Sequence, residues 1–298
     1  MAEYELKNKK LAIRVESLGA ELKSLKTNEN GTEYMWSADP EYWPRTAPIL
    51  FPFIGRLKNS QYRYKGKTYT ISPHGFARDT EFELAKRTEN SLLFEIKDSE
   101  KTREVYPFPF ILRLCYELED HSLKVKYFVK NTGNDLMLFS IGGHPGFNCP
   151  LKGTAEKRSE CFLLFKGKQP LTGIHCRDID MSTGLAKNTF TDFSLNQGKL
   201  QIKDDLFKDD ALVLENQIDG VSILGKNGKP YLTFQMDAPV YGIWSCVKEG
   251  SPFVCIEPWF GRCDRTDFEG SLEEREFQNS LKPGETFEKE YRIILENI

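Results

Sequence analysis

The chain has 298 residues, of which 39% are hydrophobic and 29% charged, and its net charge is −3. This composition is ordinary for a globular protein, and mixed charge without a basic stripe argues against nucleic acid as a partner. No stretch approaches the roughly 18 apolar residues of a membrane span, and the N-terminus lacks the apolar segment of a signal peptide. Seven cysteines, an odd number without a C-x-x-C pair, favour reduced thiols. We therefore expect a cytoplasmic protein without a membrane contact.

Strand signals follow one another along the whole chain. Short runs rich in β-branched and aromatic residues alternate with Gly, Asn and Pro turns, and Lys65-Gly66 joins two such runs as a hairpin. The expected strands cover residues 11–15, 22–25, 61–64, 67–71, 92–96, 111–118, 123–129, 136–141, 161–165, 211–214, 221–224, 231–236, 242–246, 253–256 and 287–295. No helix of three or more turns, fixed-period repeat or low-complexity linker interrupts them. We predict an all-β fold, a single domain over residues 1–298 built as a large antiparallel β-sandwich.

Two of the four histidines stand in similar surroundings. His74 lies in P-H-G-F and His144 in G-G-H-P-G-F. Glycine permits sharp turns and close approach of a ligand, and proline stiffens the loop, so each imidazole is held in a fixed direction. Either histidine taken singly could equally be a hydrogen-bonded structural residue in a tight turn.

Glu257 follows the apolar run 253–256 and precedes Pro258-Trp259-Phe260-Gly261. Because proline is disfavoured in central strands, we expect the strand to end here and Glu257 to stand at the rim of a sheet beside Trp259. A carboxylate against apolar surface has a raised proton affinity, which suits a general base near neutral pH. The alternative is a strand-end glutamate in a salt bridge or a turn.

Several classes of enzyme site are poorly supported. The helical zinc motif H-E-x-x-H is absent, so we predict no metal; G-x-S-x-G, G-x-G-x-x-G and the P-loop are absent too, so we predict no cofactor. One Glu with two His instead suits the opening of a sugar hemiacetal, in which a base deprotonates the anomeric hydroxyl while an acid protonates the ring oxygen. Glycoside hydrolysis would favour a pair of carboxylates.

Five short motifs, in this order, resemble one known family. They are Pro48-Ile49-Leu50-Phe51-Pro52 with Gly55-Arg56-Leu57, Pro73-His74-Gly75-Phe76-Ala77-Arg78, Gly142-Gly143-His144-Pro145-Gly146-Phe147-Asn148, Asp209-Asp210-Ala211-Leu212, and Ile256-Glu257-Pro258-Trp259-Phe260-Gly261. Together they are similar to the aldose 1-epimerases (galactose mutarotases), in particular the shorter bacterial LacX-like branch.

The resemblance implies a galactose mutarotase-like β-supersandwich, a small sugar as substrate and no cofactor. It implies Glu257 as general base, His144 as general acid at the ring oxygen and His74 as a second histidine there. The remaining positions expected to bind the sugar are Arg56, Trp259, Asn148 and an aspartate near 210, for which we favour Asp210 over Asp209 because it adjoins the apolar run.

Two other functions remain open. A hexose-6-phosphate 1-epimerase would need a cationic pocket, for which the candidates are Arg45, Arg78, Arg262 and Arg265. A non-catalytic carbohydrate-binding sandwich would use the aromatic residues Trp36, Trp43, Trp244 and Trp259 without the proton transfer.

Overall fold

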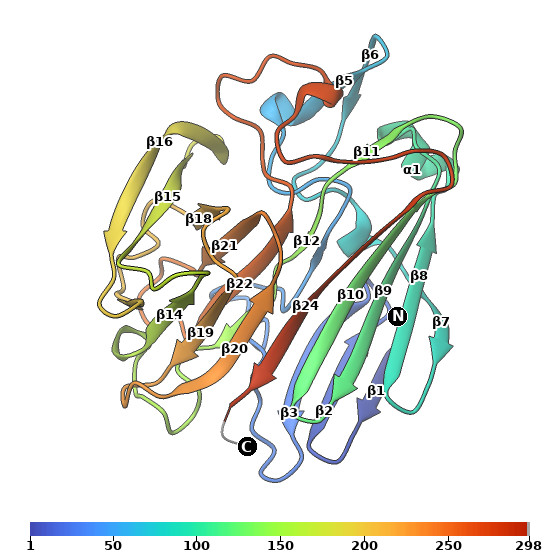
Figure 1. Ribbon diagram of the computed structural model, residues 1–298. Helices are drawn as coiled ribbons and strands as arrows, with labels where there is room; N and C mark the ends of the chain where they lie inside the picture. Colours follow the sequence, from blue (N-terminus) through green and yellow to red (C-terminus); the bar gives the residue numbers. More distant parts are fainter. Residues whose placement is uncertain (297–298) are drawn as a thin grey trace.

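The computed structural model describes residues 1–296, and nearly all of its regular structure is antiparallel β-sheet (Figure 1). Within these residues the one α-helix is α1 (Glu100–Val105). Single 3-10 turns are formed by Lys58–Ser60, Ala77–Asp79, Arg158–Glu160 and Leu272–Glu274. The predicted all-β antiparallel sandwich is therefore confirmed, whereas the assignment of residues 1–298 to one domain stays a prediction.

One layer is a nine-stranded sheet. Its order is β17 (Lys199–Gln201), β14 (Phe162–Lys166), β19 (Gly220–Leu224), β20 (Pro230–Met236), β24 (Thr286–Leu295), β10 (Ser122–Asn131), β9 (Phe110–Glu119), β8 (Ser91–Lys97) and β7 (Glu83–Arg87).

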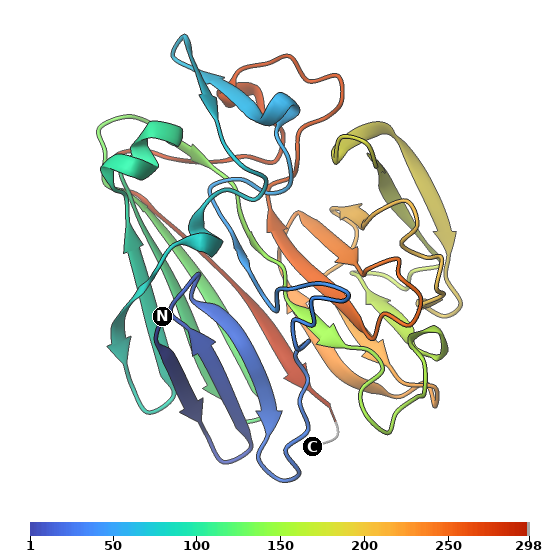
Figure 2. The ribbon, with the colours of Figure 1, turned by 180° about the vertical axis from the view of Figure 1, so that it is seen from behind.

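The other layer contains two sheets that lie side by side, as the front and back views show together (Figures 1 and 2). The smaller one is β1 (Glu3–Lys7), β2 (Leu11–Glu16) and β3 (Glu21–Thr27). The larger one runs β16 (Leu185–Ser194), β15 (Gly173–Asp180), β18 (Leu212–Glu215), β21 (Val240–Trp244), β22 (Phe253–Phe260), β12 (Ile141–Gly143) and β4 (Ile49–Leu50), with β13 (Gly146–Asn148) also beside β22. Two short pairs complete the fold, β5 (Gln61–Tyr64) with β6 (Lys67–Thr70) and β11 (Met137–Phe139) with β23 (Asn279–Leu281).

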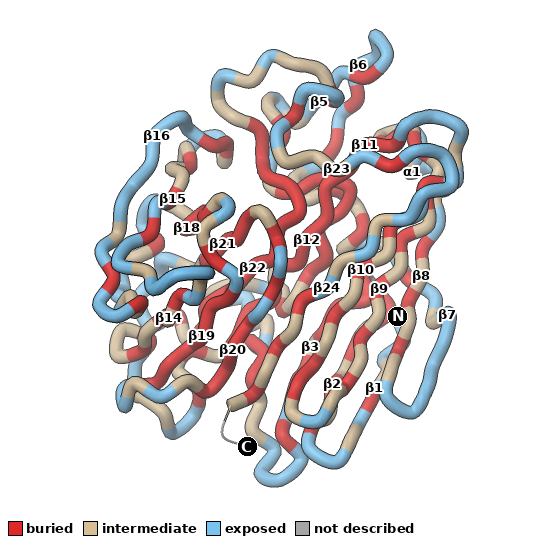
Figure 3. The backbone as a smooth tube through the Cα atoms, viewed as in Figure 1, coloured by how far each residue is buried: buried red, intermediate tan, exposed pale blue. Residues whose placement is uncertain are grey.

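The core lies between the layers and follows from the alternation of the strands. In β9 the side chains of Leu112, Leu114 and Tyr116 are buried, while the residues between them are only half-buried (Figure 3). Successive side chains of a strand point to opposite faces, so a strict alternation buries one face and leaves the other wet. Strand β22 differs, because every one of its residues is buried.

The prediction that the strand ends before Pro258 is wrong. Both Glu257 and Pro258 lie inside β22, paired with Gly242 and Tyr241 of β21. On its other edge β22 pairs with β13 up to Cys255 and with β12 from Trp259 onward. The partner strand is interrupted between β12 and β13, opposite residues 256–258 of β22. The missing N–H of Pro258 is tolerated there because no partner strand pairs with it on this edge.

Eight of the observed strands were not expected from the sequence, namely β1, β4, β7, β13, β15, β16, β17 and β23. In β16 most residues after Ala186 are exposed, so no apolar alternation marks the strand. Within residues 1–296, no helix has the length and apolarity needed to cross a bilayer.

Candidate active site

A pocket of about 620 Å³ opens on the face of β22 that is turned away from the core. The alternation of β22 creates this face. Val254, Ile256 and Phe260 belong to the main core, whereas Glu257 and Trp259, one strand period apart, line the pocket. A strand buried on both faces thus presents a carboxylate to an enclosed space.

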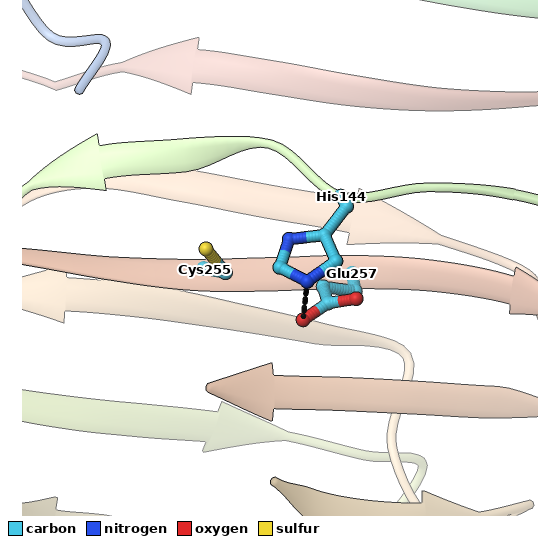
Figure 4. Close-up of side chains that lie close together, drawn as sticks. All are labelled: His144, Cys255 and Glu257. Atoms are coloured by element: carbon cyan, nitrogen blue, oxygen red, sulfur yellow. Dashed lines mark ion pairs between the residues drawn. The ribbon is translucent and has the colours of Figure 1, made fainter. Parts of the chain in front are cut away.

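Glu257 is almost fully buried, with 1% of its side chain exposed. Its Oε2 accepts a hydrogen bond of 3.1 Å from the indole N–H of Trp259, and its Oε1 lies 3.2 Å from Nε2 of His144 (Figure 4). Burial raises the pKa of the Glu257 carboxyl well above its usual range, the Trp259 hydrogen bond acts against this, and the charge of Asp210 adds to it. The carboxyl therefore holds a proton far more readily than a solvated glutamate does.

His144 occupies the short break between β12 and β13. Its backbone N–H donates to the carbonyl of Pro48 at 3.0 Å, and its ring stacks on Trp43 with the centroids 4.6 Å apart. Burial lowers the pKa of His144 to about 3, and the charges of Arg78 and Arg45 act in the same direction. The aromatic wall thus fixes the ring and disfavours its cation.

When the two groups share one proton, that proton can lie on either of them. Protonated Glu257 with neutral His144, and carboxylate with imidazolium, differ only in which atom carries that proton. Such a pair can take a proton from one ligand oxygen and give a proton to a neighbouring one. This is acid–base chemistry without a change in the total charge of the pocket.

His74 reaches the same pocket from a strained turn. Its φ is 65° and that of Gly75 is 71°, and a Cβ at Gly75 would come within 2.2 Å of the carbonyl oxygen of Phe51. The backbone N–H of Gly55 donates to Nδ1 of His74 at 3.2 Å, so the neutral ring carries its proton on Nε2. Burial, followed by the neighbouring His144 and Arg78, lowers the pKa of His74 well below its usual value. The ring centroids of His74 and His144 are 6.1 Å apart.

Two charged side chains also line the pocket. Arg56 runs against Gly184, where a Cβ would lie 2.8 Å from Cδ of the arginine, so a larger residue there would have to displace the arginine side chain. Asp210 has a φ of 81° and its Oδ1 accepts a hydrogen bond of 2.8 Å from the N–H of Ala211. Asp209 is exposed and lines a neighbouring cavity instead.

Comparison with known proteins identifies the family. The family model described as aldose 1-epimerase matches residues 2–293. The chain belongs to the aldose 1-epimerase family. Protein LacX (plasmid) of Lactococcus lactis subsp. lactis is 34% identical over 309 residues, covering 98% of this chain and 99% of LacX.

Two solved structures are similar over the whole chain. The galactose mutarotase related enzyme of Lactobacillus acidophilus has a TM-score of 0.91 and 36% identity, covering 99% of this chain and 98% of that one. A galactose mutarotase-like protein of Lactobacillus casei has a TM-score of 0.88 and 26% identity, covering 99% and 100%. The resemblance stated from the sequence is therefore confirmed, and the family makes this protein a sugar isomerase by class.

The structure brings all but one of the expected site residues to one pocket. The residues that line it are Arg56, His74, His144, Asp210, Glu257 and Trp259. Asn148 is not among them, because its Nδ2 donates to the carbonyl of Glu33 at 2.9 Å. Asn148 is the last residue of β13, which begins just after Pro145. Its side chain links β13 to the segment before β4.

Of the four arginines considered for a phosphate, only Arg78 lines the pocket. Arg45 does not line the pocket and forms an ion pair of 2.7 Å with Asp79, the residue after Arg78. Arg262 is buried against Glu215 and Glu276, and Arg265 pairs with Asp267 and Glu276; both line a separate cavity.

Part of the pocket wall was missed by sequence reasoning. Unexpected lining residues are Ile179, Met181, Gly184, Phe207, Val247 and Cys263. The first three belong to β15 and to the turn before β16. Met181 is 58% exposed although apolar. The one sequence signal was the turn-forming run Ser182-Thr183-Gly184, which marks a hairpin but not its place in the fold.

Proposed function

We propose that this protein is an aldose 1-epimerase that interconverts the α and β anomers of an aldohexose without a cofactor. The observation that supports this is the contact of 3.2 Å between Nε2 of His144 and Oε1 of Glu257 inside a sugar-sized pocket. The anomeric hydroxyl and the ring oxygen of a pyranose are bonded to one carbon, so an acid and a base this close can act on both at once.

The reaction follows from the single proton that the pair holds. Glu257 as carboxylate removes the proton from the anomeric hydroxyl, His144 as imidazolium protonates the ring oxygen, and the bond between the anomeric carbon and that oxygen breaks. The open aldehyde turns about its C1–C2 bond. Proton transfer in the reverse sense then closes the ring on the other face and restores both groups. No proton enters or leaves the pocket over the cycle.

The other lining residues bind and orient the sugar in this proposal. The proton that His74 carries on Nε2 makes it a second donor for the ring oxygen. Arg56 and Asp210 provide a donor and an acceptor for hydroxyl groups, and the aromatic wall of Trp43, Trp244 and Trp259 stacks on the apolar face of the ring. The cytoplasmic location expected from the sequence stays a prediction.

Polarimetry of freshly dissolved α-glucose and α-galactose tests the proposal. We expect equilibration well above the buffer rate, saturating with sugar concentration. Saturable sugar binding in calorimetry with no acceleration over buffer would identify a carbohydrate-binding module instead.

A hexose-6-phosphate is the second candidate substrate, and the observation that favours it is Arg78. Arg78 lines the pocket, and with Arg45 it carries positive charge toward His144 and His74. Rates for glucose and glucose 6-phosphate in NMR exchange experiments separate the two substrates. If phosphate is preferred, Arg78→Gln removes the preference, while Arg265→Gln, on a separate cavity, leaves it intact.

A further inference from the structure

Cys255 lies one strand period before Glu257 and shares its face of β22. One nitrogen of His144, the Sγ of Cys255 and one oxygen of Glu257 all lie within 4.8 Å of one another. Figure 4 shows these three side chains gathered together, with the Nδ1 edge of the imidazole on the side of Cys255. Imidazole, thiolate and carboxylate are the ligand types that Zn²⁺ takes in proteins. We propose that this His144–Cys255–Glu257 cluster is an inhibitory binding site for Zn²⁺.

The distances are close to those that a tetrahedral zinc needs. Zn–N and Zn–O bonds of about 2.0–2.1 Å place the two ligand atoms about 3.3 Å apart, and a Zn–S bond of about 2.3 Å places sulfur about 3.6 Å from nitrogen. Nε2 of His144 and Oε1 of Glu257 are already 3.2 Å apart. The thiol lies within 4.8 Å of the other two ligand atoms and has to move inward to bond the metal. The fourth position faces the pocket and is left to water or a sugar hydroxyl.

A second observation concerns the other nitrogen of the same imidazole. Among the described residues, Nδ1 of His144 has no hydrogen-bond partner although the atom is buried. Buried polar atoms normally have one, and an exception needs a physical reason. Coordination of a metal through Nε2 therefore breaks no hydrogen bond at Nδ1.

The charges balance in this buried site. Zn²⁺ replaces the single proton of the His144–Glu257 pair and the proton of the Cys255 thiol, so two protons leave. Zn²⁺ with one carboxylate, one thiolate and one neutral imidazole is a neutral complex. The pocket therefore gains no net charge, which lowers the cost of holding a dication away from solvent.

Metal binding does not depend on the function proposed above, but inhibition does. With zinc bound, neither Glu257 nor His144 can exchange a proton with a sugar. The inhibition is then reversed by a chelator. A failure of inhibition with metal bound would count against the proposed catalytic pair and not against the metal site.

Co²⁺ as a spectroscopic substitute for Zn²⁺ tests the site on the intact protein. We expect one equivalent of Co²⁺ to produce a thiolate-to-cobalt charge-transfer band in the near ultraviolet, which Zn²⁺ then displaces. Cys255→Ser should abolish the band and weaken Zn²⁺ binding in calorimetry at least ~100-fold, beyond the ~10–100-fold that loss of an outer partner costs.

Cys246→Ser is the matched control, because Cys246 lines the same pocket but does not belong to the cluster. It should leave the band and the Zn²⁺ affinity unchanged. No thiolate band in the wild-type protein overturns the proposal, and this outcome holds even if Cys255→Ser does not fold. A band that persists in Cys255→Ser or disappears in Cys246→Ser also overturns it.

Discussion

Strands β9 and β22 follow the same alternation, yet they use their second face in opposite ways. In β9 the polar alternates Arg113 and Glu117 pair with charged residues of neighbouring strands, at 2.6 Å to Glu95 and 2.7 Å to Lys126. In β22 the polar alternate Glu257 is buried and meets an imidazole that burial keeps neutral.

The difference shows that the surroundings of a strand face, solvent or packed protein, decide whether a glutamate on it is an ion-pair partner or a proton carrier. The free face of β9 borders solvent. Partial burial acts to raise the pKa of Glu95, but the hydrogen bonds and charges of Arg113 and Lys97 outweigh it and lower the pKa. The free face of β22 is walled by β15, the turn after it and the aromatic loops. There burial raises the pKa of Glu257, and the carboxyl becomes a proton carrier.

The largest effect should come from removing the carboxyl of β22. Glu257→Gln keeps the size and hydrogen bonding of the side chain but removes the base, so we expect kcat to fall ~10²–10⁴-fold, the usual contribution of acid–base catalysis. Sugar affinity should change far less. Glu117→Gln is the matched control on β9 and should keep full activity. Full activity of Glu257→Gln in polarimetry would disprove the proposed reaction.

His144→Asn should cost a similar factor, because it removes the acid of the same step. Since Glu257 and His144 hold one proton between them, the double variant should be little slower than either single variant, far from the product of the two losses. Multiplicative losses would mean that the two residues act in separate steps. The measurement is kcat of all three variants under identical conditions.

The pH profile of kcat/KM should be broad and flat. The active pair holds one proton, and burial pushes the two pKa values apart, that of His144 down to about 3 and that of Glu257 upward. We expect the rate to fall tenfold per pH unit only in strong acid and again well above the usual glutamate range. The two limbs belong to the pair and not to single residues. Unshifted groups would instead give a narrow bell between roughly 4.3 and 6.5.

His74→Asn should have a smaller effect. His74 touches the pocket but not Glu257, so its loss removes one hydrogen bond to the sugar, worth about 0.5–1.5 kcal/mol or up to roughly tenfold in rate. The flat pH profile should persist in this variant, because the proton pair is intact. A loss as large as that of Glu257→Gln would make His74 the acid in place of His144.

The sequence predicts the strands of the nine-stranded sheet better than the walls of the pocket. β9 alternates over its whole length and β10 over most of it, and the two histidine loops are marked by glycine and proline. Motifs of this kind identify chemistry, and here they identified every charged lining residue of the proposed sugar site. They do not say which face of a strand a residue takes, so Asn148 was assigned to the pocket although it lies elsewhere.

What the sequence could not reveal depends on pairing between distant segments. Pro258 fits inside β22 only because its partner changes from β13 to β12 opposite it. β16 is a strand because it pairs with β15 over most of its length, and not because its own residues alternate. The same pairing brings Gly184 against Arg56, residues far apart in the chain.

The smallest effect should come from the ion pairs of β9. Arg113→Ala removes a contact of 2.6 Å to Glu95, but the arginine side chain is 41% exposed, and such pairs contribute less than ~1 kcal/mol. Leu114→Ala on the other face of the same strand should cost about 2–5 kcal/mol, because it leaves a cavity in the core. Urea unfolding of both variants checks this contrast.

The Arg113–Glu95 ion pair also predicts how its small contribution to the free energy of unfolding changes with pH. The pKa of Glu95 is lowered in the folded chain, so its contribution is present above the ordinary glutamate value and is lost as the pH falls through the lowered one. The difference in unfolding free energy between the wild type and Arg113→Ala should therefore shrink on acidification below roughly pH 4. A difference that grows in acid, or one as large as that of Leu114→Ala, would mean that the outer face of β9 is not solvated and that its contrast with β22 does not hold.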